Sequence, residues 1–156
     1  YFSNLVHVVD RLSVSGATGV VLFNRFYEPD IDIHNLKITT AEVFSSPADI
    51  RQSLHWVAIT SSKVKNLDIA ASTGVHDGSA VVKQLLAGAR AVQVCSAVYK
   101  NGPDVVTRMI QFLEEWMDEQ NFDTVDDFRG RMGYRNIPDP VLYERAQFMK
   151  YFSSFE

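Results

Sequence analysis

Three short apolar runs, separated by amphipathic stretches, constrain the fold of this chain more than any other feature. They cover residues 20–23, 67–71 and 91–94. Their apolarity is continuous rather than alternating, which is typical of strands buried on both faces of a parallel sheet. Helical stretches between them give the alternation of an α/β fold with parallel strands. Three such strands cannot cover themselves, so the pattern favours part of a larger sheet or barrel.

Local signals predict where the other elements lie. Ser3 or Asn4 can cap the first helix, and Ser46 followed by Pro47 starts another. Gly88 stands where a left-handed helix end is expected. Apolar and polar residues alternate over 28–44 and predict a β-hairpin there. This hairpin would interrupt the order of strands and helices. Helices are expected over 3–12, from 46, over 79–87, over about 103–117 and, with an aromatic stripe of Tyr143, Phe148, Tyr151 and Phe152, in the C-terminal tail.

Composition excludes several classes of protein. The 156 residues are 46% hydrophobic and 22% charged, which is ordinary for one globular domain with a core. The net charge of −4, without a basic block, argues against nucleic acid as a partner. No apolar run approaches the length of a membrane span, and no secretory signal is visible. The single Cys95 excludes an internal disulfide, which is typical of a cytoplasmic protein. Together with the short apolar runs, it leads us to expect a cytoplasmic protein without a membrane partner.

The start of the chain is unusual for a complete protein. Tyr1 leads directly into an apolar-periodic segment, without an initiator Met. We therefore expect the sequence to be a piece of a longer chain.

Loops that follow the strands are the places where chemistry is expected, because ligands of parallel α/β folds bind at the carboxyl ends of the strands. Asn24 follows the first run, residues 72–75 follow the second, and Cys95 and Ser96 follow the third. Small residues let backbone N–H groups approach an anion, and the helix that begins near Gly78 adds the positive end of its dipole. An ordinary strand-to-helix turn is the alternative explanation for each loop.

The histidines and the cysteine do not form a recognisable reactive or metal-binding set. The four histidines share no ligand spacing, so no metal site is expected. Cys95 has no histidine at a spacing that indicates activation, and we expect it to be a small buried residue. The histidines are His7, His34, His55 and His76.

Three neighbouring motifs resemble one known family. Residues 71–78 read Ala-Ser-Thr-Gly-Val-His-Asp-Gly, and residues 84–89 read Gln-Leu-Leu-Ala-Gly-Ala. Residues 91–103 continue with Ala-Val-Gln-Val-Cys-Ser-Ala-Val-Tyr-Lys-Asn-Gly-Pro, and residues 128–130 are Phe-Arg-Gly. In order and spacing these motifs are similar to the C-terminal, flavin-phosphate region of dihydroorotate dehydrogenases.

The resemblance implies a fold and an activity. The chain would supply about strands six to eight of an eight-stranded (β/α)8 TIM barrel, with residues 1–130 as a partial FMN-binding barrel and 131–156 as a C-terminal helical extension. The longer protein would oxidise dihydroorotate to orotate in pyrimidine biosynthesis with FMN as cofactor. The family's catalytic base and flavin-contacting lysine belong before residue 1, so the resemblance places no catalytic residue in this chain, which would be inactive alone.

The resemblance also implies roles for individual residues. Asn24 would hydrogen-bond the substrate, and the FMN phosphate would be held at the ends of strands seven and eight. The cofactor-binding residues implied are Ser72, Thr73, Gly74, Val75, Cys95 and Ser96.

Two departures from the family pattern leave other functions open. Thr73-Gly74 replaces the usual Gly-Gly, and Cys95 replaces the glycine that usually precedes the Ser or Thr of the last strand. One alternative is a flavin barrel of the dihydropyrimidine dehydrogenase type, and another is a divergent binding module without catalysis. We also expect the isolated chain to self-associate, because apolar faces would be uncovered, and the longer protein to be a homo-oligomer.

Overall fold

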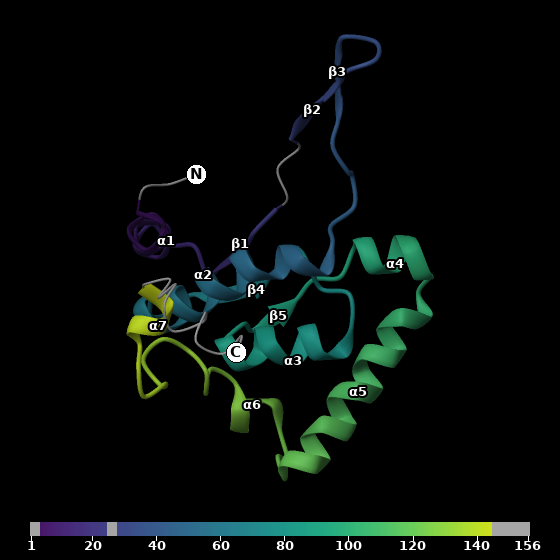
Figure 1. Ribbon diagram of the computed structural model, residues 1–156. Helices are drawn as coiled ribbons and strands as arrows, with labels where there is room; N and C mark the ends of the chain where they lie inside the picture. The colour runs from purple at the N-terminus through teal and green to yellow at the C-terminus, as the bar shows by residue number, and fades with distance from the viewer. Residues whose placement is uncertain (1–3, 25–27, 145–156) are drawn as a thin grey trace, which may run out of the picture.

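A computed structural model describes residues 4–24 and 28–144 (Figure 1). The helices are α1 Leu5–Val14, α2 Ile50–Lys63, α3 Gly78–Ala87, α4 Ser96–Asn101, α5 Asp104–Gln120, α6 Val125–Phe128 and α7 Val141–Glu144, with a 3-10 turn over Pro47–Asp49. The strands are β1 Gly19–Leu22, β2 Pro29–Asp32, β3 Lys37–Thr40, β4 Asp68–Ala71 and β5 Ala91–Val92. The predicted mixed α/β class is therefore confirmed.

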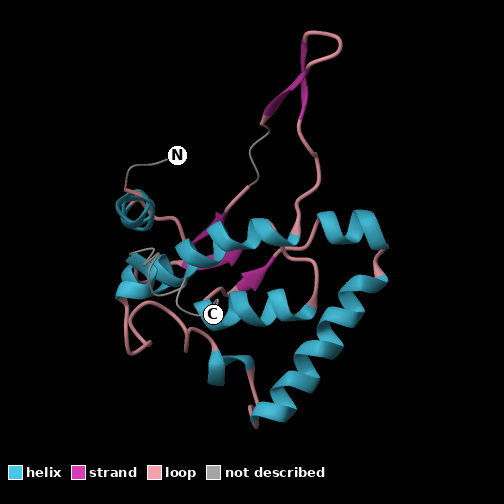
Figure 2. Cartoon of the chain, in the orientation of Figure 1, coloured by secondary structure: helices cyan, strands magenta, loops and turns pink. Residues whose placement is uncertain are grey.

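The three apolar runs form one parallel sheet in the order β1-β4-β5 (Figure 2). Helices α2 and α3 pack against it, and α1 packs against α2. Leu22, Ile69 and Ala71 point to the helices and are 4%, 2% and 0% exposed. These side chains meet α2 and α3 in the main core, so the helices cover one face of the sheet.

Within the described residues these strands are buried on one face only, as expected because three such strands cannot cover themselves. Val21 is 48% exposed, whereas its chain neighbour Leu22 is buried. Side chains of a strand alternate between the two faces, and the core cluster contains only the helix-facing residues of β1 and β4. The second face of the sheet, which includes Val21 and Ala91, is therefore accessible.

Local capping explains the boundaries of α1 and α3. The Asn4 side chain accepts a hydrogen bond from the His7 backbone N–H at 3.1 Å, and Asp77 accepts one from Ala80 at 2.7 Å. At the end of α3, Gly88 has φ +113°, the left-handed conformation expected from the sequence. These boundaries were predictable because the residues that set them are close neighbours in the chain.

The last apolar run departs from its predicted form. Strand β5 ends at Val92 instead of Val94, and α4 begins at Ser96, where no helix was expected. Because α4 has only six residues, it is too short for a clear periodic pattern in the sequence. The turn between them places Cys95 at the helix N-cap.

The segment between β1 and α2 forms an amphipathic hairpin of β2 and β3, which projects beyond the body of the molecule in Figures 1 and 2. Ile31 pairs with Ile38 across the two strands, and Ile33 and Leu36 lie in the turn that joins them. These four side chains are 64% to 88% exposed. The hairpin therefore carries one uncovered apolar face.

The segment after α5 is hydrogen-bonded to α2 and to the carboxyl end of α3. Backbone N–H groups of alternate residues donate to helix carbonyls: Gly130 to Leu85 at 3.0 Å, Met132 to Leu86 at 2.9 Å and Tyr134 to Ala58 at 3.0 Å. Leu86 lies in the last turn of α3, where a helix leaves carbonyls without partners, whereas Leu85 also accepts from the Gly88 N–H and Ala58 lies inside α2. The segment is thereby fixed to the core on the amino-terminal side of α7.

Only the beginning of the predicted aromatic helix lies in the described part of the chain. Tyr143 of α7 is half-buried and donates its hydroxyl to the Met132 carbonyl at 2.7 Å. The other aromatic residues of that stripe, Phe148, Tyr151 and Phe152, lie outside the described residues. Among the described helices, none has the length and apolarity needed to cross a bilayer.

Candidate functional site

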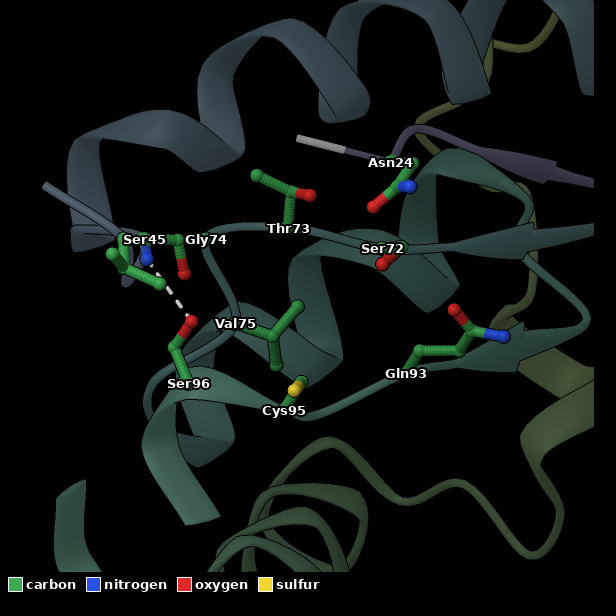
Figure 3. Close-up of a pocket in the computed structure, with 10 residues that line it drawn as sticks. Asn24, Ser45, Ser72, Thr73, Gly74, Val75, Gln93, Cys95 and Ser96 are labelled. Carbon is green, nitrogen blue, oxygen red and sulfur yellow. Dashed lines mark hydrogen bonds between the residues drawn. The ribbon is translucent and has the colours of Figure 1, made fainter. Parts of the chain in front are cut away.

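A cavity of about 200 Å³ lies at the carboxyl ends of the three parallel strands (Figure 3). The segments that follow all three strands contribute to its lining, as does the segment that leads from the hairpin to α2. The lining residues are Asn24, Val43, Ser45, Ser72, Thr73, Gly74, Val75, Gln93, Cys95 and Ser96. All seven residues singled out in the sequence are among them.

The parallel register explains why residues so far apart in the chain meet here. Strand β4 lies between β1 and β5, so the three strand ends share one edge of the sheet. Backbone bonds continue past the strands: Ser72 N–H donates to the Leu22 carbonyl at 2.9 Å, and Gln93 N–H donates to the Ala71 carbonyl at 2.8 Å. The loops that follow therefore start side by side.

Thr73 adopts a backbone conformation that is unusual for a β-branched residue. Its φ is +77°, in the left-handed region that glycine adopts most easily. Its hydroxyl donates a hydrogen bond to the Phe23 carbonyl at 2.8 Å, which ties the loop after β4 to the end of β1. The loop thus keeps a glycine-like backbone at Thr73, with the side-chain hydroxyl engaged by the neighbouring strand.

Gly74 could not be replaced without moving backbone atoms. A Cβ at this position would lie 2.6 Å from the Ile50 Cα and 2.7 Å from the Asp49 carbonyl carbon, and φ is +77°. The loop therefore packs directly on the first turn of α2. This close approach requires glycine, whatever the loop binds.

Backbone N–H groups along the cavity have no hydrogen-bond partner within the described residues. They belong to two loops, and those of Gly74 and Val75 come from residues that are buried. A buried backbone N–H without an acceptor costs free energy, so nearly all such groups in proteins are paired. Donors clustered in this way are suited to an anion. The unpaired N–H groups are those of Thr73, Gly74, Val75, Cys95 and Ser96.

Ser45 closes one end of the cavity and orients Ser96. Its backbone N–H donates to the Ser96 hydroxyl oxygen at 3.0 Å, drawn as a dashed line in Figure 3. Its own hydroxyl lies 3.1 Å from His76 Nε2, and its carbonyl accepts from Lys100 Nζ at 3.3 Å. Because the Ser96 oxygen already accepts one bond, its proton stays available for a further acceptor. Ser45 is only 6% exposed, so this arrangement is well fixed.

The charges around the cavity also favour an anion. No carboxylate is among the lining residues, and the Lys100 ammonium is close to Ser45 at one end. The dipole of α3 contributes less than the sequence indicated, because the Asp77 carboxylate already caps its first turn. Binding would therefore depend mainly on backbone donors and hydroxyl groups.

The structure corrects one expectation and adds residues that the sequence did not indicate. Cys95 is exposed rather than buried, because it follows the short β5 on the accessible side of the sheet. Val43, Ser45 and Gln93 line the cavity without having been predicted. Gln93 follows β5 directly, a position that could have indicated it, but nothing local to Val43 or Ser45 did.

The histidines and acidic residues are also candidate metal ligands within the described part of the chain. The described residues contain no group of three or more His, Cys, Asp or Glu side chains placed to hold a metal ion. His55 instead packs edge-on against Trp56 at 5.0 Å, and burial lowers the pKa of its imidazole. His76 contacts Ser45.

Part of the chain resembles dihydroorotate dehydrogenases in sequence. Dihydroorotate dehydrogenase A (fumarate) of Lactococcus lactis subsp. lactis (strain IL1403) is 33% identical over 66 residues, which are 42% of this chain and 21% of that protein. The enzyme of the same name from Lactococcus lactis subsp. cremoris (strain MG1363) is 32% identical over 66 residues, with the same coverage of both chains. The predicted resemblance to this family is confirmed over the matched region, which spans about a fifth of the relatives' length.

Solved structures share the fold over more of the chain. The crystal structure of DHODH from Eimeria tenella in complex with ferulenol has a TM-score of 0.65 and 22% identity, covering 80% of this chain and 33% of that one. The ligand-free DHODH of the same organism has a TM-score of 0.60 and 23% identity, covering 80% and 35%. No protein-family profile matches the chain.

Proposed function

We propose that this chain forms the last three strands, six to eight, of an FMN-dependent barrel that oxidises dihydroorotate to orotate, and that its cavity holds the FMN phosphate. Unpaired backbone N–H groups at the carboxyl ends of parallel strands carry the proposal. Loops after the last two strands are the usual phosphate site of a TIM barrel. The partial likeness to dihydroorotate dehydrogenases supports the choice of substrate.

The residues present fit a phosphate group. Backbone donors of Thr73, Gly74 and Val75 would face it from one loop, and those of Cys95 and Ser96 from the other. The Ser96 hydroxyl would add a further donor, since Ser45 already occupies its oxygen. Thr73 is compatible with this role because it keeps a glycine-like φ and engages its own hydroxyl with the Phe23 carbonyl.

The size of the cavity indicates which part of the cofactor it would take. Its volume of about 200 Å³ is below the roughly 300–1,000 Å³ of complete small-molecule sites. In Figure 3, Ser45 and Ser96 lie at one end, and Asn24 and Gln93 lie at the other. We propose the phosphate at the first end and the substrate near Asn24, which would hydrogen-bond it. FMN, when bound, accepts the hydride from the substrate.

The chain alone would then be inactive. Its sheet has one accessible face, and the proposed catalytic base would come from residues before Tyr1. Residues 1–130 would be the barrel portion and 131–156 a helical extension. We further propose a cytoplasmic, homo-oligomeric protein, and self-association of the isolated chain through its uncovered apolar faces.

Titration with FMN and with riboflavin tests this proposal. Both flavins would be added to the 156-residue chain and to a longer protein that contains it, followed by an assay of dihydroorotate oxidation. We expect the longer protein to bind FMN more tightly than riboflavin, because only FMN carries the phosphate, and to form orotate. Equal affinity for the two flavins would refute the phosphate site. Uracil reduction without orotate formation would favour the dihydropyrimidine dehydrogenase type.

A further inference from the structure

We infer that Gln84 is a positioning residue for the loop of Thr73 and Gly74, an inference that rests on the proposed phosphate site. Gln84 lies on α3, is 0% exposed, and does not line the cavity. Burying an amide costs free energy unless it is hydrogen-bonded, and an apolar side chain of similar length would fill the same space. The contact made by the Gln84 Nε2 is therefore its distinguishing feature, since its Oε1 is buried without a partner among the described residues.

A short chain of contacts joins Gln84 to the loop. Its Nε2 donates to the Ser53 hydroxyl oxygen at 2.7 Å, and Ser53, on α2, is itself only 1% exposed. The Ser53 hydroxyl lies 3.2 Å from the Ile50 carbonyl oxygen and 3.5 Å from the Thr73 carbonyl oxygen. Since the Ser53 oxygen accepts from Gln84, its single proton faces these two carbonyls, of which that of Ile50 is the nearer.

The two carbonyls belong to surfaces that are in direct contact. Gly74 packs on the Ile50 backbone without room for a Cβ, and Thr73 has φ +77°. A β-branched residue keeps such a conformation only when its surroundings hold it there. Thr73 is held on one side by the bond from its hydroxyl to Phe23 and on the other through Ser53. Gln84 supports the second of these contacts.

The consequence concerns phosphate recognition specifically. The N–H groups of Thr73, Gly74 and Val75 point where the loop backbone directs them, so a loop fixed in advance loses less entropy when it binds an anion. Removing the Gln84 amide would loosen the loop and weaken binding of FMN. Riboflavin, which lacks the phosphate, would be affected far less.

The substitution Gln84→Met tests this role, with Thr60→Val as a matched control. Thr60 is also 0% exposed and lies on α2, but its hydroxyl has no partner among the described residues. In the FMN-binding protein we expect Gln84→Met to weaken FMN binding about tenfold and to change riboflavin binding by less than about twofold. Thr60→Val should change the affinity for neither flavin.

Hydrogen exchange of backbone amides gives a second measurement that needs no cofactor. In the ligand-free protein, Gln84→Met should speed exchange of the Ser72 amide, which donates to the Leu22 carbonyl at the start of the loop, and leave the Asp68 amide in β4, which donates to the Thr18 carbonyl, unchanged. In a Ser53→Ala background it should have no further effect on the loop, because Gln84 acts through Ser53.

The outcomes separate this inference from the proposed function. If the unsubstituted protein does not prefer FMN to riboflavin, the proposed function fails, and hydrogen exchange alone decides whether Gln84 positions the loop. Unchanged loop exchange would overturn the inference. So would faster exchange at β4 and loop alike, or an equal loss of FMN and riboflavin binding, because these results indicate a general effect on stability.

Discussion

Replacing Gly74 by alanine should damage the protein more than replacing another glycine of the same backbone type. The new Cβ would lie 2.6 Å from the Ile50 Cα and 2.7 Å from the Asp49 carbonyl carbon. These are backbone atoms at the start of α2, so no side chain can rotate away to make room. The loop or the first turn of the helix must move.

Gly16 provides the comparison. It also has positive φ, at +98°, but a Cβ there would meet nothing within 4 Å. Gly16→Ala therefore carries only the left-handed strain of alanine, about 1–2 kcal/mol of unfolding free energy. Gly74→Ala adds an overpacking cost of about 1–3 kcal/mol, so its total should reach about 2–5 kcal/mol.

Urea unfolding followed by tryptophan fluorescence measures both losses, because Trp56 lies on the displaced helix. If Gly74→Ala costs no more than Gly16→Ala, the contact between the loop and α2 is not as close as described, and the reasoning is refuted. Under the proposed function, Gly74→Ala should also reduce the preference for FMN over riboflavin, whereas Gly16→Ala should preserve it.

Three further predictions concern other parts of the molecule. Burial lowers the pKa of His55 below its ordinary value of about 6.5, so the unfolded chain binds the proton more tightly than the folded chain. The free energy of unfolding should therefore decrease as the pH falls below that value. His55→Phe should reduce this pH dependence in urea unfolding, and an unchanged dependence would contradict the assignment to His55. Phe128 is 0% exposed and packs edge-on against Trp116 at 5.0 Å. Phe128→Ala should therefore lower the free energy of unfolding in urea by about 3–5 kcal/mol. A loss below about 1 kcal/mol would show that the segment after α5 is not fixed to the core as described. The Ile33 and Leu36 side chains are 72% and 88% exposed. Replacing both by serine should reduce self-association in light scattering and change the unfolding free energy of the monomer by less than about 0.5 kcal/mol. Unchanged self-association would show that the hairpin is not the contact surface and would favour the accessible face of the sheet.

The role of the hairpin is broader than that of an appended loop. Its return segment delivers Ser45 to the cavity, where the Ser45 backbone N–H meets Ser96 and its carbonyl meets Lys100. An insertion between β1 and α2 is thus coupled to the end of β5. A change in the hairpin that displaced Ser45 would alter the hydrogen bonding of Ser96 without touching the strands.

Departures from the family pattern have different structural consequences. Thr73 has the left-handed backbone that glycine adopts most easily, and its hydroxyl donates to the Phe23 carbonyl. Cys95 is exposed at the N-cap of α4, where a side chain meets solvent rather than the core. Neither replacement fills the cavity with a bulky side chain, which is consistent with the proposed phosphate site.

Features that depend on near neighbours could be predicted from the amino-acid sequence alone. Caps such as Asp77 and the left-handed Gly88 act over a few residues, and the order of apolar runs indicated parallel strands. From that order it followed that the loops after the strands would meet at one edge. The grouping of Asn24 with residues 72–75 and 95–96 could therefore be predicted before any coordinates.

Other features could not be predicted in this way, because they depend on contacts between segments that are distant in the chain. Ser45 and Ser96 are 51 positions apart, and no local pattern relates them. The left-handed Thr73 is supported by Phe23, 50 positions away, and by Ser53, 20 positions away. Burial of a strand face likewise depends on what packs against it, which is why Val21 is exposed although its apolar run predicted a buried strand. The sequence pattern sets which way side chains point, and packing determines what each of them meets.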